Sequence, residues 1–216
     1  MASPGAGLNP HTSLVLRLVR GAALWVLPIL AFTAFAMTWF YRASTYRLFD
    51  EPLNNTITAL SASVDFGPEN TLFLAREPID PRYQQALSGY YWIIGTFGDE
   101  GKIVPLRASR SMADDTLTLP MADVTVIKNN PGQFVQSRSD GPDAIDPVRV
   151  VAKSVTFQEM GGQPLVMIAA ADSRPAARGV RNFAALIIGF MAFLTIGLIG
   201  GIFAQVRLGL RPLFDL

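Results

Sequence analysis

The chain has 216 residues, half of them hydrophobic, and its 18 basic and 17 acidic side chains almost cancel. A near-neutral chain without a basic stripe is not typical of a nucleic-acid-binding protein, so we predict no nucleic-acid partner. The chain contains no cysteine, which excludes a disulfide framework and a thiolate metal site. Its one histidine, His11, leaves almost no material for a histidine-based zinc site or a Ser-His-Asp triad.

The first hydrophobic segment, residues 21–41, has no charged side chain and is long enough to form a transmembrane helix. Arg17 and Arg20 precede it in a tail, residues 1–20, that we predict to be cytoplasmic. The alternative is a cleaved signal peptide whose small-residue cleavage site would end at Ala36. The apolar run continues for five residues past Ala36, which favours a retained helix. Under either interpretation, the next region lies outside the cytoplasm.

The 140 residues from 42 to 181 separate this segment from a second hydrophobic one. They open with apolar residues at spacings of three and four, as on one face of a helix: Tyr46, Phe49, Leu53, Ile57, Leu60 and Val64. Pro52 suits the first turn of a helix, with Asp50 or Glu51 as its cap. A break and restart of the helix at Pro52 is therefore a further expectation.

After this helix the pattern changes to that of strands. The continuous apolar and aromatic run at 90–94 predicts a strand buried on both faces. Pro105 places the following strand at an edge or a bulge of the sheet. The other predicted elements are a short helix at 80–87, strands at 102–108 and 124–127, a loop over 129–146, a hairpin of 147–157 with 165–171, and a connection over 172–181. Helices followed by hairpins are typical of an α+β domain with an antiparallel sheet.

The second hydrophobic segment, residues 182–206, also lacks charged side chains and predicts a second transmembrane helix. Gly197 and Gly201 continue a four-residue spacing of small side chains, which lets membrane helices approach closely. We interpret them as a surface along which helices move during signalling. Residues 207–216 are typical of the start of a further helix, and we expect them to begin a cytoplasmic linker that is cut off. Arg211 and Pro212 are its candidate signal-transmission residues.

Four short motifs carry a resemblance. Ser-Gly-Tyr-Tyr-Trp at 88–92, Ser-Arg-Ser at 109–111 and Asp-Pro-Arg-Tyr at 80–83 resemble the N-terminal sensor region of bacterial two-component sensor histidine kinases. Gly-Leu-Arg-Pro-Leu at 209–213 is similar to the opening of a HAMP linker. The chain departs from the family at 112–115, where Met-Ala-Asp-Asp replaces a bulky run. The family's phosphoacceptor histidine and ATP-binding boxes are absent from these 216 residues.

The resemblance implies a membrane protein with two transmembrane α-helices flanking an extracytoplasmic α+β sensor domain, PAS-like and built on an antiparallel sheet. It implies a multi-pass protein of the bacterial inner membrane, with the sensor domain in the periplasm and two copies forming a homodimer. An unknown small ligand would control autophosphorylation of a kinase module beyond residue 216. That module would use ATP and magnesium and act on a response regulator, whereas this segment needs no cofactor.

Two other functions remain open from the residues alone. The same receptor architecture can carry a different output, such as a chemoreceptor module or a cyclic-dinucleotide enzyme. The chain can also be a membrane-anchored scaffold protein. A reading frame that continues past residue 216 into a helix with a histidine, followed by an ATP-binding domain, would favour the kinase.

Candidate ligand-binding residues lie in the motifs that carry the resemblance. Tyr91 and Trp92 could line a ligand pocket, and the alternative is a strand of the hydrophobic core. Arg110 could bind an anionic ligand through two hydrogen bonds, and the alternative is a structural or solvated arginine. We predict no catalytic residue in this segment. We also predict no metal site, because the acidic residues at 99–100, 114–115 and 140–146 lack the spacing of a calcium loop.

Overall fold

A computed structural model describes residues 10–68, 71–98, 102–113, 115, 117–142 and 147–209. The chain divides into two compact units. The sheet unit is Ser44–Arg178, and the helical unit combines Met1–Ala43 with Gly179–Leu216. Arg211 and Pro212 lie outside the described residues, as do the acidic residues 99, 100, 114, 143 and 146.

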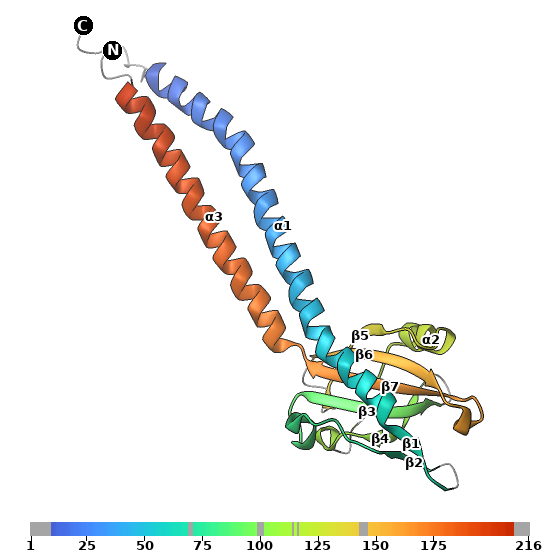
Figure 1. Cartoon of the computed structure of the whole chain (residues 1–216). Helices are drawn as coiled ribbons and strands as arrows, with labels where there is room; N and C mark the ends of the chain where they lie inside the picture. Colours follow the sequence, from blue (N-terminus) through green and yellow to red (C-terminus); the bar gives the residue numbers. More distant parts are fainter. Residues whose placement is uncertain are drawn as a thin grey trace, which may run out of the picture. The chain divides into compact units, whose positions relative to one another are not determined.

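The sheet unit is built on one five-stranded sheet in which every neighbouring pair is antiparallel (Figure 1). Its strand order is β4-β3-β7-β6-β5. The strands are β3 Tyr90–Phe97, β4 Ile103–Ala108, β5 Val135–Asp140, β6 Pro147–Thr156 and β7 Pro164–Asp172. A separate small hairpin pairs β1 Val64–Phe66 with β2 Leu72–Leu74. The predicted antiparallel sheet and the predicted hairpin of β6 with β7 are confirmed.

In the part of the chain that the structure describes, three α-helices accompany the sheet: α1 Pro10–Ser63, α2 Met121–Asn129 and α3 Arg174–Gly209. Single 3-10 turns form η2 Pro81–Gln84, η4 Arg110–Met112 and η6 Gln158–Met160. The turn η2 confirms the predicted short helix in a shorter form. α1 runs without interruption through Pro52, so the predicted break is wrong. Pro52 is exposed, and the burial of Leu53 beside it holds the helix together.

One local prediction in the second half of the domain is wrong, and another, that residues 129–146 are mostly loop, omits a strand. The strand predicted at 124–127 is part of α2. Its β-branched residues favour a strand, but Val124 and Ile127, three positions apart, are the two that are buried, which is the helical period. The loop predicted over 129–146 contains β5, an edge strand of mostly polar residues in which only Ser137 is buried. Such a strand carries little hydrophobic alternation to reveal it.

The sheet has a hydrophobic cluster on each face, because alternate side chains of a strand point to opposite sides. One cluster combines Trp92, Ile94 and Met167 with the helix residues Leu53, Ile57 and Leu60. The other combines Tyr91, Ile93 and Ile168 with Met112, Leu117 and Ile127. The predicted apolar stripe of the helix and the predicted strand buried on both faces are therefore confirmed.

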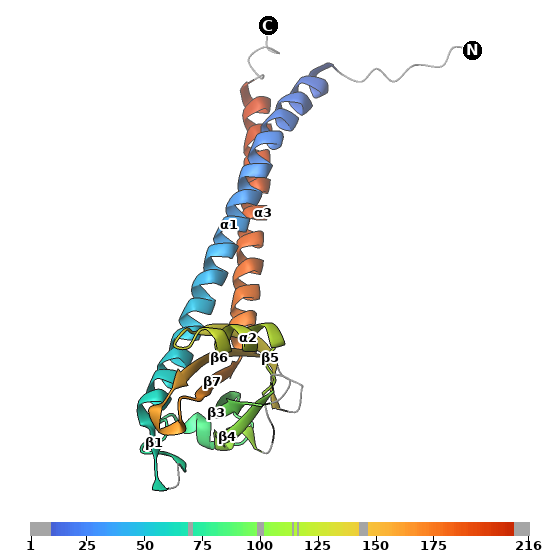
Figure 2. The same cartoon turned by 90° about the vertical axis from the view of Figure 1, so that its right-hand side faces the viewer.

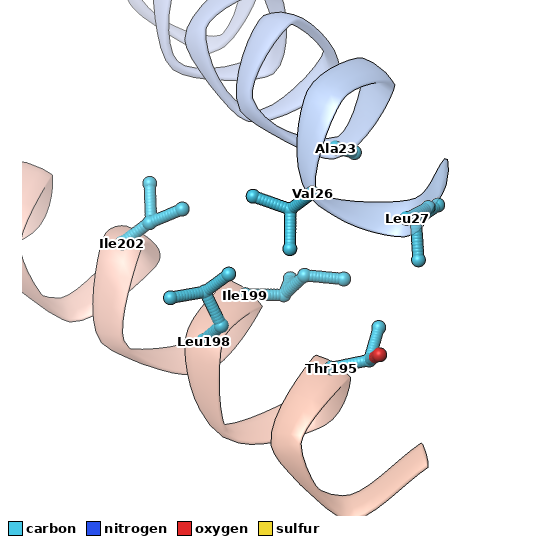
Figure 3. Close-up of a pocket in the computed structure, with 7 residues that line it drawn as sticks. All are labelled: Ala23, Val26, Leu27, Thr195, Leu198, Ile199 and Ile202. Atoms are coloured by element: carbon cyan, nitrogen blue, oxygen red, sulfur yellow. The ribbon is translucent and has the colours of Figure 1, made fainter. Parts of the chain in front are cut away.

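The helical unit contains the two hydrophobic segments, which lie side by side as parts of α1 and α3 (Figure 2). The ring of Tyr41 stacks on that of Phe183 with 4.0 Å between centroids. Farther along, side chains of both helices, apolar except for Thr195, line a small cavity (Figure 3): Ala23, Val26, Leu27, Thr195, Leu198, Ile199 and Ile202. Large apolar side chains such as Trp25, Phe40 and Phe193 are exposed. By length and composition, both helices could span a membrane.

Candidate functional site

The predicted ligand residues Tyr91 and Trp92 are neighbours on β3, and each side chain is 4% exposed. They belong to the two hydrophobic clusters on opposite faces of the sheet. They therefore do not line one shared pocket, and their position is that of core residues. Arg110 lies in η4 and is exposed, between the buried residues Ser109 and Ser111.

The two serines that flank Arg110 hold the start of β3. The backbone N–H of Trp92 donates to Ser109 Oγ at 3.1 Å, and the Ser109 N–H donates to the Trp92 carbonyl at 2.9 Å. Ser111 Oγ donates to the Tyr90 carbonyl at 2.5 Å, and the two serine oxygens are 2.8 Å apart. Each hydroxyl has one proton, so the Ser109 hydroxyl donates to Ser111 Oγ. The structure thus joins the motifs at 88–92 and 109–111, and gives the two serines a structural role.

Replacing Ser109 by alanine is expected to lower the free energy of unfolding by about 1–3 kcal/mol, because the buried Trp92 N–H loses its acceptor. Calorimetry of the full chain in detergent micelles measures this loss. Thr125→Ala is the matched control, since its exposed hydroxyl bonds only to the Met121 carbonyl of its own helix. The control is expected to change stability by less than about 0.5 kcal/mol. Equal losses in both variants would contradict the role given to Ser109.

A partly buried ion pair joins α1 to the sheet on its Trp92 face. Asp50 of α1 is 3% exposed and accepts two hydrogen bonds from the Arg149 guanidinium of β6, from Nε to Oδ1 and from a terminal nitrogen to Oδ2 at 2.6 Å. The Tyr46 ring, one helical turn before Asp50, lies 5.0 Å from the guanidinium carbon. Gln136 Oε1 of β5 accepts a further hydrogen bond from Arg149 at 3.3 Å. Hydrogen bonding to Asp50 raises the pKa of Arg149, so the arginine stays charged.

The sequence expectation for Asp50 was a helix cap, and it is wrong because α1 does not begin there. A signal for the ion pair was present in the sequence. Asp50 lies between Phe49 and Leu53, on the apolar face of the predicted helix, where an acidic side chain needs a partner. The partner, Arg149, is 99 positions away, so local spacing could not identify it.

The same end of β6 also holds the start of α3. The Pro147 carbonyl accepts hydrogen bonds from the Ser173 N–H at 3.1 Å and from Ser173 Oγ at 2.8 Å. Asp172, the last residue of β7, accepts the Arg174 N–H at 2.8 Å and forms an ion pair with the Arg174 guanidinium at 2.9 Å. The connection predicted over 172–181 is therefore helical from Arg174 onward, and one residue separates β7 from α3.

We call Pro147, Val148 and Arg149 the β6 base. It contacts α1 through Arg149 and the α3 junction through Pro147. Val148 between them is buried in the cluster on the opposite face and pairs with Asp172 of β7. The β6 base is the candidate functional site of the sheet unit, because it is where both long helices are attached to one strand.

The predicted signal-transmission residues Gly197 and Gly201 lie on α3 in the helical unit. A Cβ atom added at either glycine would meet no heavy atom within 4 Å. Both line an open groove with neighbouring α3 side chains: Phe193, Leu194, Leu198, Ile202 and Gln205. Within the described residues, no cluster of three or more His, Asp or Glu side chains could hold a metal ion.

Comparisons with protein-family models, with curated proteins and with solved structures find no match to this chain.

Proposed function

We propose that the chain is the signal-sensing input module of a transmembrane receptor in the bacterial inner membrane. The sheet unit would be a PAS-like sensor domain in the periplasm, and α1 and α3 would cross the membrane. The observation that carries this proposal is the direct connection from the central strand β7 to the apolar helix α3. It offers a path along which a change in the sheet reaches a membrane helix.

The path is stiff because each step is backbone or a short hydrogen bond. β7 pairs with β3 on one side and with β6 on the other, and its residues from Leu165 to Ala171 are buried. Ser173 is held by Pro147, and α3 begins at the next residue. A shift of β7 would therefore reach the start of α3. A ligand changes the output only by its different affinity for the two arrangements of the sheet.

The output is proposed from the resemblance to sensor histidine kinases. The signal would control autophosphorylation of a kinase module outside these residues, with ATP, magnesium and a response regulator as its partners. A homodimer is proposed as the working form, and the open glycine groove of α3 is compatible with close helix pairing.

The membrane layout provides the first test. The proposed function requires the sheet unit on one side of the membrane and residues 3 and 215 together on the other side. Because the chain contains no cysteine, a single introduced cysteine is the only thiol in the protein that a maleimide can label. Gln158→Cys, at an exposed position between β6 and β7, is expected to react with a membrane-impermeant maleimide in intact spheroplasts. Ser3→Cys and Asp215→Cys are expected to react only after lysis. Labelling of all three positions from the same side would refute the proposed function.

A further inference from the structure

The ion pair between Asp50 and Arg149 differs in kind from the apolar contacts between α1 and the sheet. Leu53, Ile57 and Leu60 pack on the sheet through apolar contacts, which have no directional preference. A carboxylate and a guanidinium joined by two hydrogen bonds fix both the distance and the orientation of their carriers. This pair therefore adds a directional attachment of α1 to β6 to the apolar packing of the helix.

Two further polar contacts of α1 with the domain lie farther along the helix than the ion pair. Thr56 bonds to Tyr83 at 3.0 Å and Ser61 to Met167 at 3.0 Å, about two and three turns farther along the helix. Asp50 and Tyr46 both contact Arg149, so two successive turns of α1 meet the same guanidinium. Gln136 of β5 also accepts a hydrogen bond from that guanidinium. The attachment lies close to Ser44, where the sheet unit begins.

We propose that the Asp50–Arg149 ion pair is a clamp that makes α1 follow the β6 base. The β6 base already holds the start of α3 through Pro147 and Ser173. One strand end would then hold both long helices, and a shift of the β6 base would be passed both to α1 and to the start of α3. This inference rests on the proposed function and adds to it the mechanical route by which α1 takes part.

Hydrogen exchange of the full chain in lipid nanodiscs tests the clamp. The double variant Asp50→Leu/Arg149→Met replaces the pair by apolar side chains, which leaves no buried charge unpaired and keeps the fold. Backbone amides at 44–52 are expected to exchange about tenfold faster, because a charge-assisted tie to the sheet is lost. Amides of β7 at 165–171 are expected to stay within about threefold of the parent chain, since the central strand keeps its core.

The exposed pair of Asp80 and Arg82 is the matched control, with the same two residue types in the same domain. Asp80→Asn/Arg82→Met is expected to leave exchange at 44–52 and at 165–171 unchanged. The clamp is refuted if the double variant at Asp50 and Arg149 leaves the exchange rates of the amides at 44–52 unchanged. It is also refuted if the exchange rates in β7 rise as much as those at 44–52. Neither result depends on membrane sidedness, so failure of the clamp is distinguishable from failure of the proposed receptor layout.

Discussion

Replacing Trp92 by alanine is expected to lower the free energy of unfolding of the sheet unit by about 3–5 kcal/mol. The Trp92 side chain is buried in the cluster that joins α1 to the sheet, and its backbone is tied to Ser109. Truncation would remove buried surface and leave a cavity between α1 and the sheet. Calorimetry of the full chain in detergent micelles measures the loss.

Trp39 offers a matched control, because the same residue type is 65% exposed on α1 in the helical unit. Trp39→Ala is expected to change the unfolding of the sheet unit by less than about 0.5 kcal/mol. Trp92→Phe keeps an aromatic ring in the core. Its loss in free energy of unfolding is expected to lie between those of Trp92→Ala and Trp39→Ala. A Trp92→Ala loss below about 1 kcal/mol would reject the core position and return Trp92 to the candidates for a ligand pocket.

Replacing Gly95 by valine is expected to separate β4 from β3, with a loss of about 3 kcal/mol. The pairing of the two strands shifts register between Ile94 and Gly95, and β4 approaches closely there. A Cβ atom at Gly95 would lie 2.4 Å from the Val104 carbonyl oxygen and 2.9 Å from a side-chain carbon of Ile103. The nearest obstacle is backbone, which cannot rotate away, so the strand itself must move.

Hydrogen exchange measured strand by strand can locate this effect. Faster exchange in β4, with β6 and β7 unchanged, would agree with the local clash. Gly179→Ala is the control, because no heavy atom lies within 4 Å of an added Cβ in that helical position. It is expected to raise stability by up to about 1 kcal/mol through helix propensity. A Gly95→Val chain as stable as the parent would show that β4 can rearrange without cost.

Sequence reasoning worked where burial leaves a local periodic pattern. The stripe containing Leu53, Ile57 and Leu60 predicted the buried face of α1, and the continuous run at 90–94 predicted a strand covered on both faces. The two hydrophobic segments were recognisable from length and composition, since the thickness of a bilayer sets a local requirement. Each of these features is a pattern within one continuous stretch of the sequence.

The same reasoning failed where the local signal is weak or ambiguous. Residues 124–127 are β-branched and apolar, yet they belong to α2, whose buried positions Val124 and Ile127 pack on the sheet. β5 was missed because an edge strand needs little apolar alternation. Tertiary packing overrode local preference in the first case, and backbone pairing with β6 created the strand in the second.

The sequence by itself determined the two membrane-length helices, the apolar stripe of α1 and the buried β3 strand, because each is a short-range pattern of hydrophobicity. Only the tertiary structure decided the contacts on which the proposed function and the proposed clamp rest. Asp50 meets Arg149, and Pro147 meets Ser173, only because the order β4-β3-β7-β6-β5 places β6 beside both β7 and the Asp50 turn of α1. Partners that are 99 and 26 positions apart leave no local trace, since side-chain spacing shows which face is buried and not what covers it.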